Sequence, residues 1–246
     1  MKFILIFLLS FSCSFKSLLV SNLDYLMTDK IAEELLLNSE QEEELRVDIK
    51  NFLNETKESA KDLKVKISKI EIDKSLPIDE LKKQYLNIVR KIIPIISKYY
   101  FKLSVDQRKE FFSYHQNKNE EVKRQMIEMT IKSVSNKYDG FFGEINEKQK
   151  ELIIQNFSMI KELSKRRINR RLEIQSALKS AKNFKEVLAA FEIFTQSLKK
   201  EDELNNQFFV FLSQMIMKTN KNQKETLKKK KIEIVQILEY YLTNTY

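Results

Sequence analysis

The sequence predicts an all-α fold, a bundle of long antiparallel amphipathic helices, and three observations predict it. The 246 residues include only two glycines and two prolines, so the turn residues of a β-rich fold are scarce. Charged residues make up 32% of the chain and hydrophobic residues 42%, which leaves enough apolar side chains for a core and argues against disorder. Apolar residues also recur at steps of three and four along most of the chain, the period of one buried helix face.

A polar cap followed three residues later by glutamine occurs four times, and a charged helical pattern begins each time. The cap side chain accepts a hydrogen bond from a first-turn N–H, and the glutamine reaches back to the N–H of the cap, which closes a capping box. We therefore expect four helix starts, with a binding role for the glutamines as the alternative. The pairs are Asn38 with Gln41, Ser104 with Gln107, Asn146 with Gln149 and Asn220 with Gln223.

The first half of the chain predicts three helices. A short helix over residues 23–36 precedes a long one over residues 39–70, whose apolar positions form one stripe. A third helix over residues 78–102 carries Pro94 in its interior. A proline there removes a helical hydrogen bond, so we expect a kink.

The second half continues the helical pattern. A fourth helix begins at Val105 and ends near Gly140, and a fifth covers residues 147–182. A sixth pattern begins near residue 184, and the last helix covers residues 221–242. Between them, residues 208–217 form a very apolar stretch, either a buried helix or an exposed surface for clients or a partner subunit.

The N-terminus has the layout of a secretory signal, with one basic residue before an apolar run. A cysteine directly after such a run looks like a bacterial lipoprotein signal, in which the thiol is acylated. A plain signal peptide, an uncleaved anchor and an accidental apolar start are the alternatives. We expect a lipoprotein-type signal peptide over residues 1–12, lipid attachment at Cys13, a tether over residues 13–21 and a single elongated helical domain over residues 22–246. This predicts a membrane-anchored lipoprotein of the cell envelope, facing the periplasm or the cell surface.

A basic run lies inside the fifth predicted helix. The net charge of +9 favours anionic partners, and this run is the densest cluster of arginines. Contact with anionic lipid, glycan or an acidic client is one interpretation, and a solvated helix face is the other. Nucleic acid is not expected, because of the export signal and the lack of interleaved aromatic residues. The candidate residues for an anionic partner are Lys165, Arg166, Arg167, Arg170 and Arg171.

No pattern of catalytic residues stands out. His115 is the only histidine and falls on an apolar stripe, so we expect it at the edge of the core. No second histidine or cysteine has metal-ligand spacing, and no glycine-rich phosphate loop occurs. We expect neither an enzyme nor a bound metal or cofactor.

The segment Leu103-Ser104-Val105-Asp106-Gln107 is similar to the L-T-x-x-Q motif of the Spy and CpxP periplasmic proteins. Four such motifs behind a signal-like start resemble a family of all-helical bacterial envelope lipoproteins without an established activity. Residues 22–26 and 138–145 also fit that family, although Phe141 stands where it usually has tryptophan and asparagine caps three of the motifs. The resemblance implies an exported helical protein, with a chaperone or stress-response role from its Spy-like side.

Two functions follow as expectations. The first is a non-catalytic envelope protein that holds non-native or partner proteins on a cationic, partly apolar helical surface without ATP. The alternative is an envelope scaffold that docks to anionic lipid or cell-wall polymer through the basic helix face.

Overall fold

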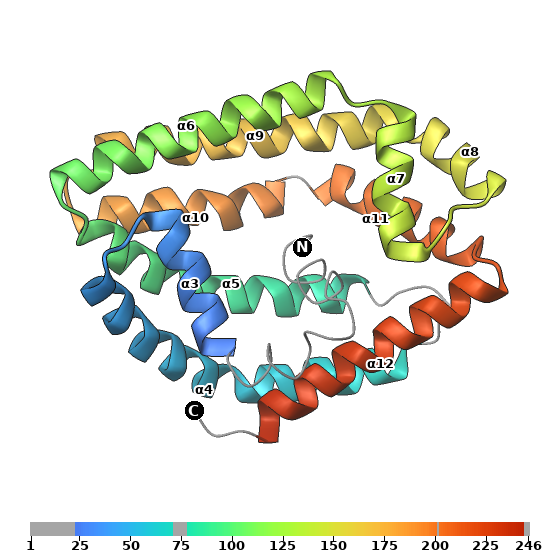
Figure 1. The fold of residues 1–246 in the computed structure, drawn as a ribbon, viewed down its shortest axis with the longest axis horizontal. Helices are drawn as coiled ribbons and strands as arrows, with labels where there is room; N and C mark the ends of the chain where they lie inside the picture. The colour runs from blue at the N-terminus through green and yellow to red at the C-terminus, as the bar shows by residue number, and fades with distance from the viewer. Residues whose placement is uncertain (1–22, 71–77, 201, 244–246) are drawn as a thin grey trace.

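A computed structural model describes residues 23–70, 78–200 and 202–243, and these ranges contain ten helices and no strand (Figure 1). The predicted all-α fold is therefore confirmed. The predicted signal peptide, the tether and Cys13 lie outside the described residues. The helices are α3 (Leu23–Leu35), α4 (Ser39–Lys69), α5 (Ile78–Phe101), α6 (Val105–Ile127), α7 (Ile131–Phe142), α8 (Glu147–Gln155), α9 (Phe157–Ser180), α10 (Phe184–Lys200), α11 (Asp202–Met217) and α12 (Lys221–Thr243).

Two predicted helices are each divided in the structure. The fourth is interrupted before α7 because Thr130 caps a new helix, accepting a hydrogen bond from the Ser133 N–H at 3.1 Å. The fifth is interrupted at Asn156, which has φ −104° and ψ 9° and separates α8 from α9. The Asn156 side chain does not cap α9 but donates to the Leu152 carbonyl at 2.8 Å. Pro94 lies inside α5, which continues through it.

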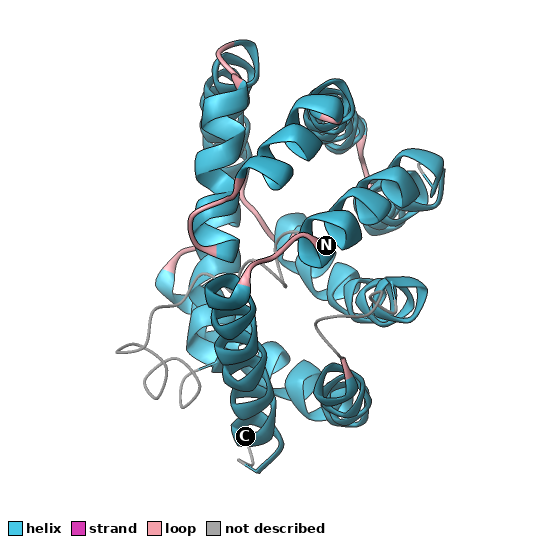
Figure 2. Ribbon diagram, turned by 90° about the vertical axis from the view of Figure 1, so that its right-hand side faces the viewer, coloured by secondary structure: helices cyan, strands magenta, loops and turns pink. Residues whose placement is uncertain are grey.

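Neighbouring helices form a closed circuit. α9 packs on α10, α10 on α5, α5 on α4, α4 on α12, α12 on α7, α7 on α8, and α8 on α9 again (Figure 1). Figure 2 shows the described helices from the side, joined by short loops. α3 covers α4, α6 covers α9, and α11 lies against α8 and α9. Short links between amphipathic helices favour such adjacent packing.

Two hydrophobic clusters form the core of this circuit. The first involves α3, α4, α5, α6 and α10 and includes Leu45, Tyr99 and Tyr100. The second involves α7, α8 and α11 and includes Phe211 and Met215. α9 and α12 each contribute to both clusters, so these two long helices join them.

Candidate functional site

All four predicted capping boxes are present. At the start of α4, the Gln41 N–H donates to Asn38 Oδ1 at 2.9 Å and the Asn38 N–H donates to Gln41 Oε1 at 3.1 Å. The same exchange starts α6, α8 and α12. Each box satisfies two backbone groups that a helix start leaves unpaired.

The glutamines of the first two motifs contact each other. Gln107 Nε2 donates to Gln41 Oε1 at 2.7 Å and to the Leu36 carbonyl at 3.2 Å. In return, Gln41 Nε2 donates to Gln107 Oε1 at 3.4 Å. Leu36 has a positive φ of 56°, which turns the chain between α3 and α4. This first glutamine pair joins the starts of α4 and α6, and both side chains are half-buried.

The glutamines of the last two motifs form the second glutamine pair, which is buried. Gln223 Nε2 donates to Gln149 Oε1 at 2.9 Å and to the Glu144 carbonyl at 2.7 Å. Gln149 Nε2 donates to the Met215 carbonyl at 3.0 Å, and Asn146 Nδ2 donates to Gln223 Oε1 at 3.2 Å. Gln149 is 0% exposed and Gln223 is 3% exposed.

The two pairs use one geometry. In each, the later glutamine donates to the carbonyl five residues before the earlier one, which is Leu36 in the first pair and Glu144 in the second. The turn before that helix contains a positive φ in both cases, at Leu36 and at Gly143 (φ 83°). Neutral amides cannot act as general acids or bases at ordinary pH, so these pairs are connections between helix starts rather than catalytic groups.

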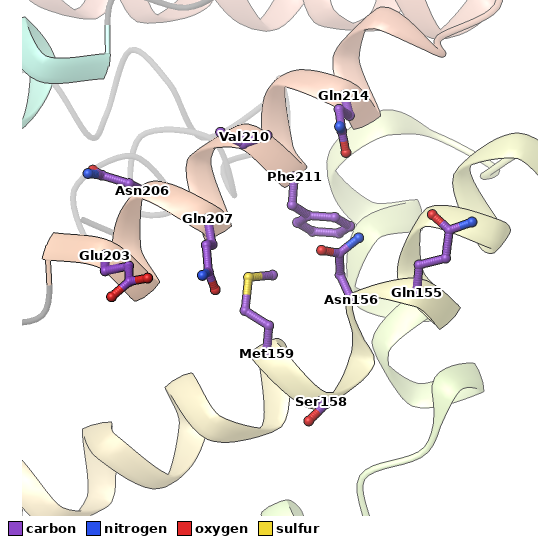
Figure 3. Close-up of a pocket in the computed structure, with 10 residues that line it drawn as sticks. All are labelled: Gln155, Asn156, Ser158, Met159, Glu203, Asn206, Gln207, Val210, Phe211 and Gln214. Carbon is purple, nitrogen blue, oxygen red and sulfur yellow. The ribbon is translucent and has the colours of Figure 1, made fainter.

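An open cavity of about 870 Å³ lies between α11 and the junction of α8 with α9 (Figure 3). Met159 and the exposed Val210 contribute apolar surface, and Glu203 is the one charged residue that lines it. We call this cavity the amide groove, because five of its ten lining residues carry amide side chains. These are Gln155, Asn156, Asn206, Gln207 and Gln214.

The predicted basic run does not present one face. Arg166 Nε donates to a glutamate one turn earlier at 3.2 Å, and the Arg170 guanidinium lies 5.4 Å from the ring centroid of a phenylalanine in α10. Arg171 faces α6, where its charge lowers the pKa of the histidine. Lys165 and Arg167 are exposed. The structure thus spreads these five cations around α9, and their binding of an anionic partner stays a prediction.

His115 lies at the edge of the first cluster and is 9% exposed. Its Nε2 donates to the Glu34 carbonyl at 2.9 Å, and its ring centroid lies 4.3 Å from that of Phe111. Burial lowers the pKa of His115, and the charges of Arg171 and Lys118 lower it further, against the opposing effect of Glu34. The His115 ring is therefore neutral, and its hydrogen bond to the Glu34 carbonyl connects α6 to α3.

The four lysines at residues 228–231 do not all face the same way. Two of them bind backbone carbonyls and two face solvent, and the sequence alone did not indicate which. Lys230 Nζ donates to the Gly140 carbonyl and Lys231 Nζ to the Ile70 carbonyl, each at 2.8 Å. These carbonyls lie at the ends of α7 and α4, where a cation is favourable. Lys228 and Lys229 are exposed instead. Because α12 packs on α4 and α7, helical spacing in α12 decides which lysines turn inward.

Within the described ranges, no group of three or more histidine, cysteine, aspartate and glutamate residues is arranged to hold a metal ion. The described helices also lack an apolar segment of the length that a membrane-spanning helix requires. Comparison of the chain with protein families, curated proteins and solved structures finds no match.

Proposed function

We propose that this protein binds extended, non-native polypeptide segments in the amide groove and holds them without catalysis or ATP. In this proposal it is a chaperone-like lipoprotein of the cell envelope, anchored through Cys13. The observation that carries the binding role is the amide-rich lining of the groove, in which Glu203 is the one charged residue, in a chain whose residues are 32% charged.

The exposed face of α11 supports this role. Residues 204–217 contain no charged side chain. Phe211 and Met215 turn into the core, being 1% and 0% exposed, whereas Val210 is 56% exposed and Asn206 and Gln207 lie beside it on the surface. The apolar stretch over residues 208–217 is therefore neither wholly buried nor wholly exposed. One face of α11 packs into the core, and the other faces solvent.

Amide side chains match the chemistry of a peptide backbone. Each carries two N–H donors and a carbonyl acceptor, so it can pair with both groups of an extended chain. Among the described residues, no hydrogen bond occupies the side-chain amides of Gln155, Asn206, Gln207 and Gln214. Met159 adds a flexible thioether, which adapts to different apolar side chains.

Other occupants fit the groove less well. A glycan is commonly bound against an exposed aromatic face, but Phe211, the aromatic residue of this groove, is 1% exposed. A lipid chain would require a mostly apolar lining, and an anion would require cations. A polypeptide needs neutral polar groups with some apolar contact, and this groove offers both.

The test is binding of a permanently unfolded client, such as reduced and carboxymethylated lactalbumin, followed by fluorescence anisotropy. The variant Gln207→Glu/Val210→Asp places two carboxylates in the groove at exposed positions, so folding should be preserved. We expect its affinity to fall at least tenfold, since buried unpaired charge is unfavourable in a complex. Aggregation of the client should also be suppressed by the parent protein and not by this variant.

The matched control is Val47→Asp/Gln125→Glu, which adds the same charges outside the groove. Val47 and Val210 are both 56% exposed, so the two double variants differ in location rather than in exposure of the valine. Equal loss of binding in both variants would remove the groove from the proposal. Absence of client binding by the parent protein at several-fold molar excess would remove the holding function.

A further inference from the structure

Four exposed lysines gather where α11 passes into α12 and along the first half of α12. They are Lys218, Lys221, Lys228 and Lys229. Within the described part of the chain, none of the four forms an ion pair. We call these four residues the lysine surface, and their charge calls for a physical explanation.

The connection beside them does not require this charge. The second glutamine pair lies next to Lys218, whose backbone carbonyl accepts from Asn146 Nδ2 at 2.8 Å. Residues 215–230 around Gln223 contain six lysines and one glutamate, whereas residues 33–48 around Gln41 contain seven carboxylates and one arginine. The same amide geometry therefore forms in environments of opposite charge.

The surroundings of the first pair are also neutralised. Lys102 pairs with Glu44, and Lys98 pairs with Asp48 at 2.6 Å. Arg46 contacts two glutamates of its own helix. In the described ranges none of the four lysines forms such an ion pair, and Glu225 is the one acidic residue among them. The net charge of the lysine surface therefore stays positive and is directed at solvent or at an external partner.

Exposed apolar side chains lie next to these lysines along the chain. Lys221, Lys228 and Ile232 follow each other at steps of seven and four, which places them on one face of α12. Ile232 is 56% exposed, and Met217, directly before Lys218, is 55% exposed. Lysines around apolar side chains on one helix face are typical of segments that lie on a membrane surface.

We propose that the lysine surface binds the anionic phospholipid headgroups of a bilayer, with Ile232 and Met217 entering the interface. Lysine is a compact point charge that suits a fluid array of headgroups. A nucleic-acid site would favour arginine and stacked aromatic rings, and this surface has neither. The inference is independent of the amide groove, since none of the four lysines lines it.

Sedimentation with vesicles tests the inference, using the expected mature chain, residues 13–246, with Cys13→Ala so that neither the apolar signal nor an acyl chain contributes. Vesicles of phosphatidylcholine with about a third of phosphatidylglycerol should bind the protein, and pure phosphatidylcholine should not. Changing the four lysines to glutamine should lower partitioning by about 10²- to 10³-fold, since each lysine near an anionic surface contributes several-fold. Raising the salt from about 0.05 M to about 0.5 M should also release the protein.

The control removes the same charge elsewhere through Lys61→Gln, Lys83→Gln, Lys182→Gln and Lys185→Gln, four exposed lysines in other parts of the chain. This variant should retain most of the binding. Equal loss in both variants would overturn the proposal in favour of net charge alone. Absence of vesicle binding, or binding to polyphosphate or duplex DNA at phosphate concentrations where vesicles fail, would overturn it as well.

Discussion

Replacing the buried Gln149 by methionine should destabilise the protein far more than the same change at Gln41. Methionine has a similar volume, so the change removes hydrogen bonds with little change in packing. In the wild-type protein, the Gln149 side chain satisfies the Asn146 N–H, one N–H of Gln223 and the Met215 carbonyl. That carbonyl lies in the last turn of α11, where the helix itself leaves carbonyls unpaired.

The magnitude follows from these three groups. Each buried group that loses its partner costs about 1 kcal/mol or somewhat more, so Gln149→Met should lower the free energy of unfolding by about 3 kcal/mol. Gln41 is half-buried and its cap N–H is exposed, so water replaces part of what is lost. For Gln41→Met we expect about 1 kcal/mol.

Thermal unfolding followed by far-ultraviolet circular dichroism measures the difference. In a chain of this size about 1 kcal/mol corresponds to 2–4 °C, so Tm should fall by about 6–12 °C for Gln149→Met and about 2–4 °C for Gln41→Met. Gln125→Met, the same change at an exposed helical position, should shift Tm by less than about 2 °C. Equal shifts for the Gln149 and Gln41 variants would refute the reasoning, because burial is what separates them.

Three further predictions concern single positions. Burial places the pKa of His115 below its ordinary 6.5, so the stability contributed by the neutral ring is complete above about pH 6.5 and is lost as the pH falls through the folded-state pKa. In urea unfolding, the loss of stability between about pH 7 and about pH 5 should therefore be smaller for His115→Gln, and an equal loss would contradict this. Gly143→Ala should cost about 1–3 kcal/mol because φ is 83° and ψ −174° there. Gly140→Ala, in open space within α7, should instead raise the unfolding free energy by about 0.5–1 kcal/mol. If Gly140→Ala destabilised the protein more than Gly143→Ala, the argument from the positive φ of Gly143 would be refuted. Thr130→Ala should cost about 1 kcal/mol and speed amide exchange in α7, and unchanged exchange there would show that the cap is dispensable.

Local signals in the sequence predicted most helix boundaries. A capping box depends on four consecutive residues, so its outcome is set before tertiary packing. The helix expected over residues 39–70 is Ser39–Lys69 in the structure. The breaks at Thr130 and Asn156 were missed, because the first box uses serine in place of glutamine and the second break has no side-chain cap.

Tertiary arrangement explains what the sequence could not predict. Nothing within one motif indicates that Gln41 meets Gln107 or that Gln149 meets Gln223, since the partners lie 66 and 74 residues apart. Periodicity also gives the faces of α9 and α12 but not which neighbour covers each face. For this reason, the sequence did not show that the cations of the basic run are spread around α9. Nor did it show that several lysines of α12 are exposed to solvent.

The amide groove shows a further limit of sequence reasoning. Its residues come from two segments far apart in the chain, and exposed glutamines and asparagines of a charged helical protein give no signal of their own. The one available indication was the apolar stretch over residues 208–217, for which a buried helix and an exposed surface for clients or a partner subunit are both expected from the sequence.

Hydrogen exchange of the protein, free and saturated with an unfolded client, tests the central claim most directly. Binding in the amide groove predicts slower amide exchange confined to residues 155–159 and 203–214, the segments that line the groove (Figure 3). Unchanged exchange in both segments, with slower exchange at the lysine surface or along α9 instead, would contradict it.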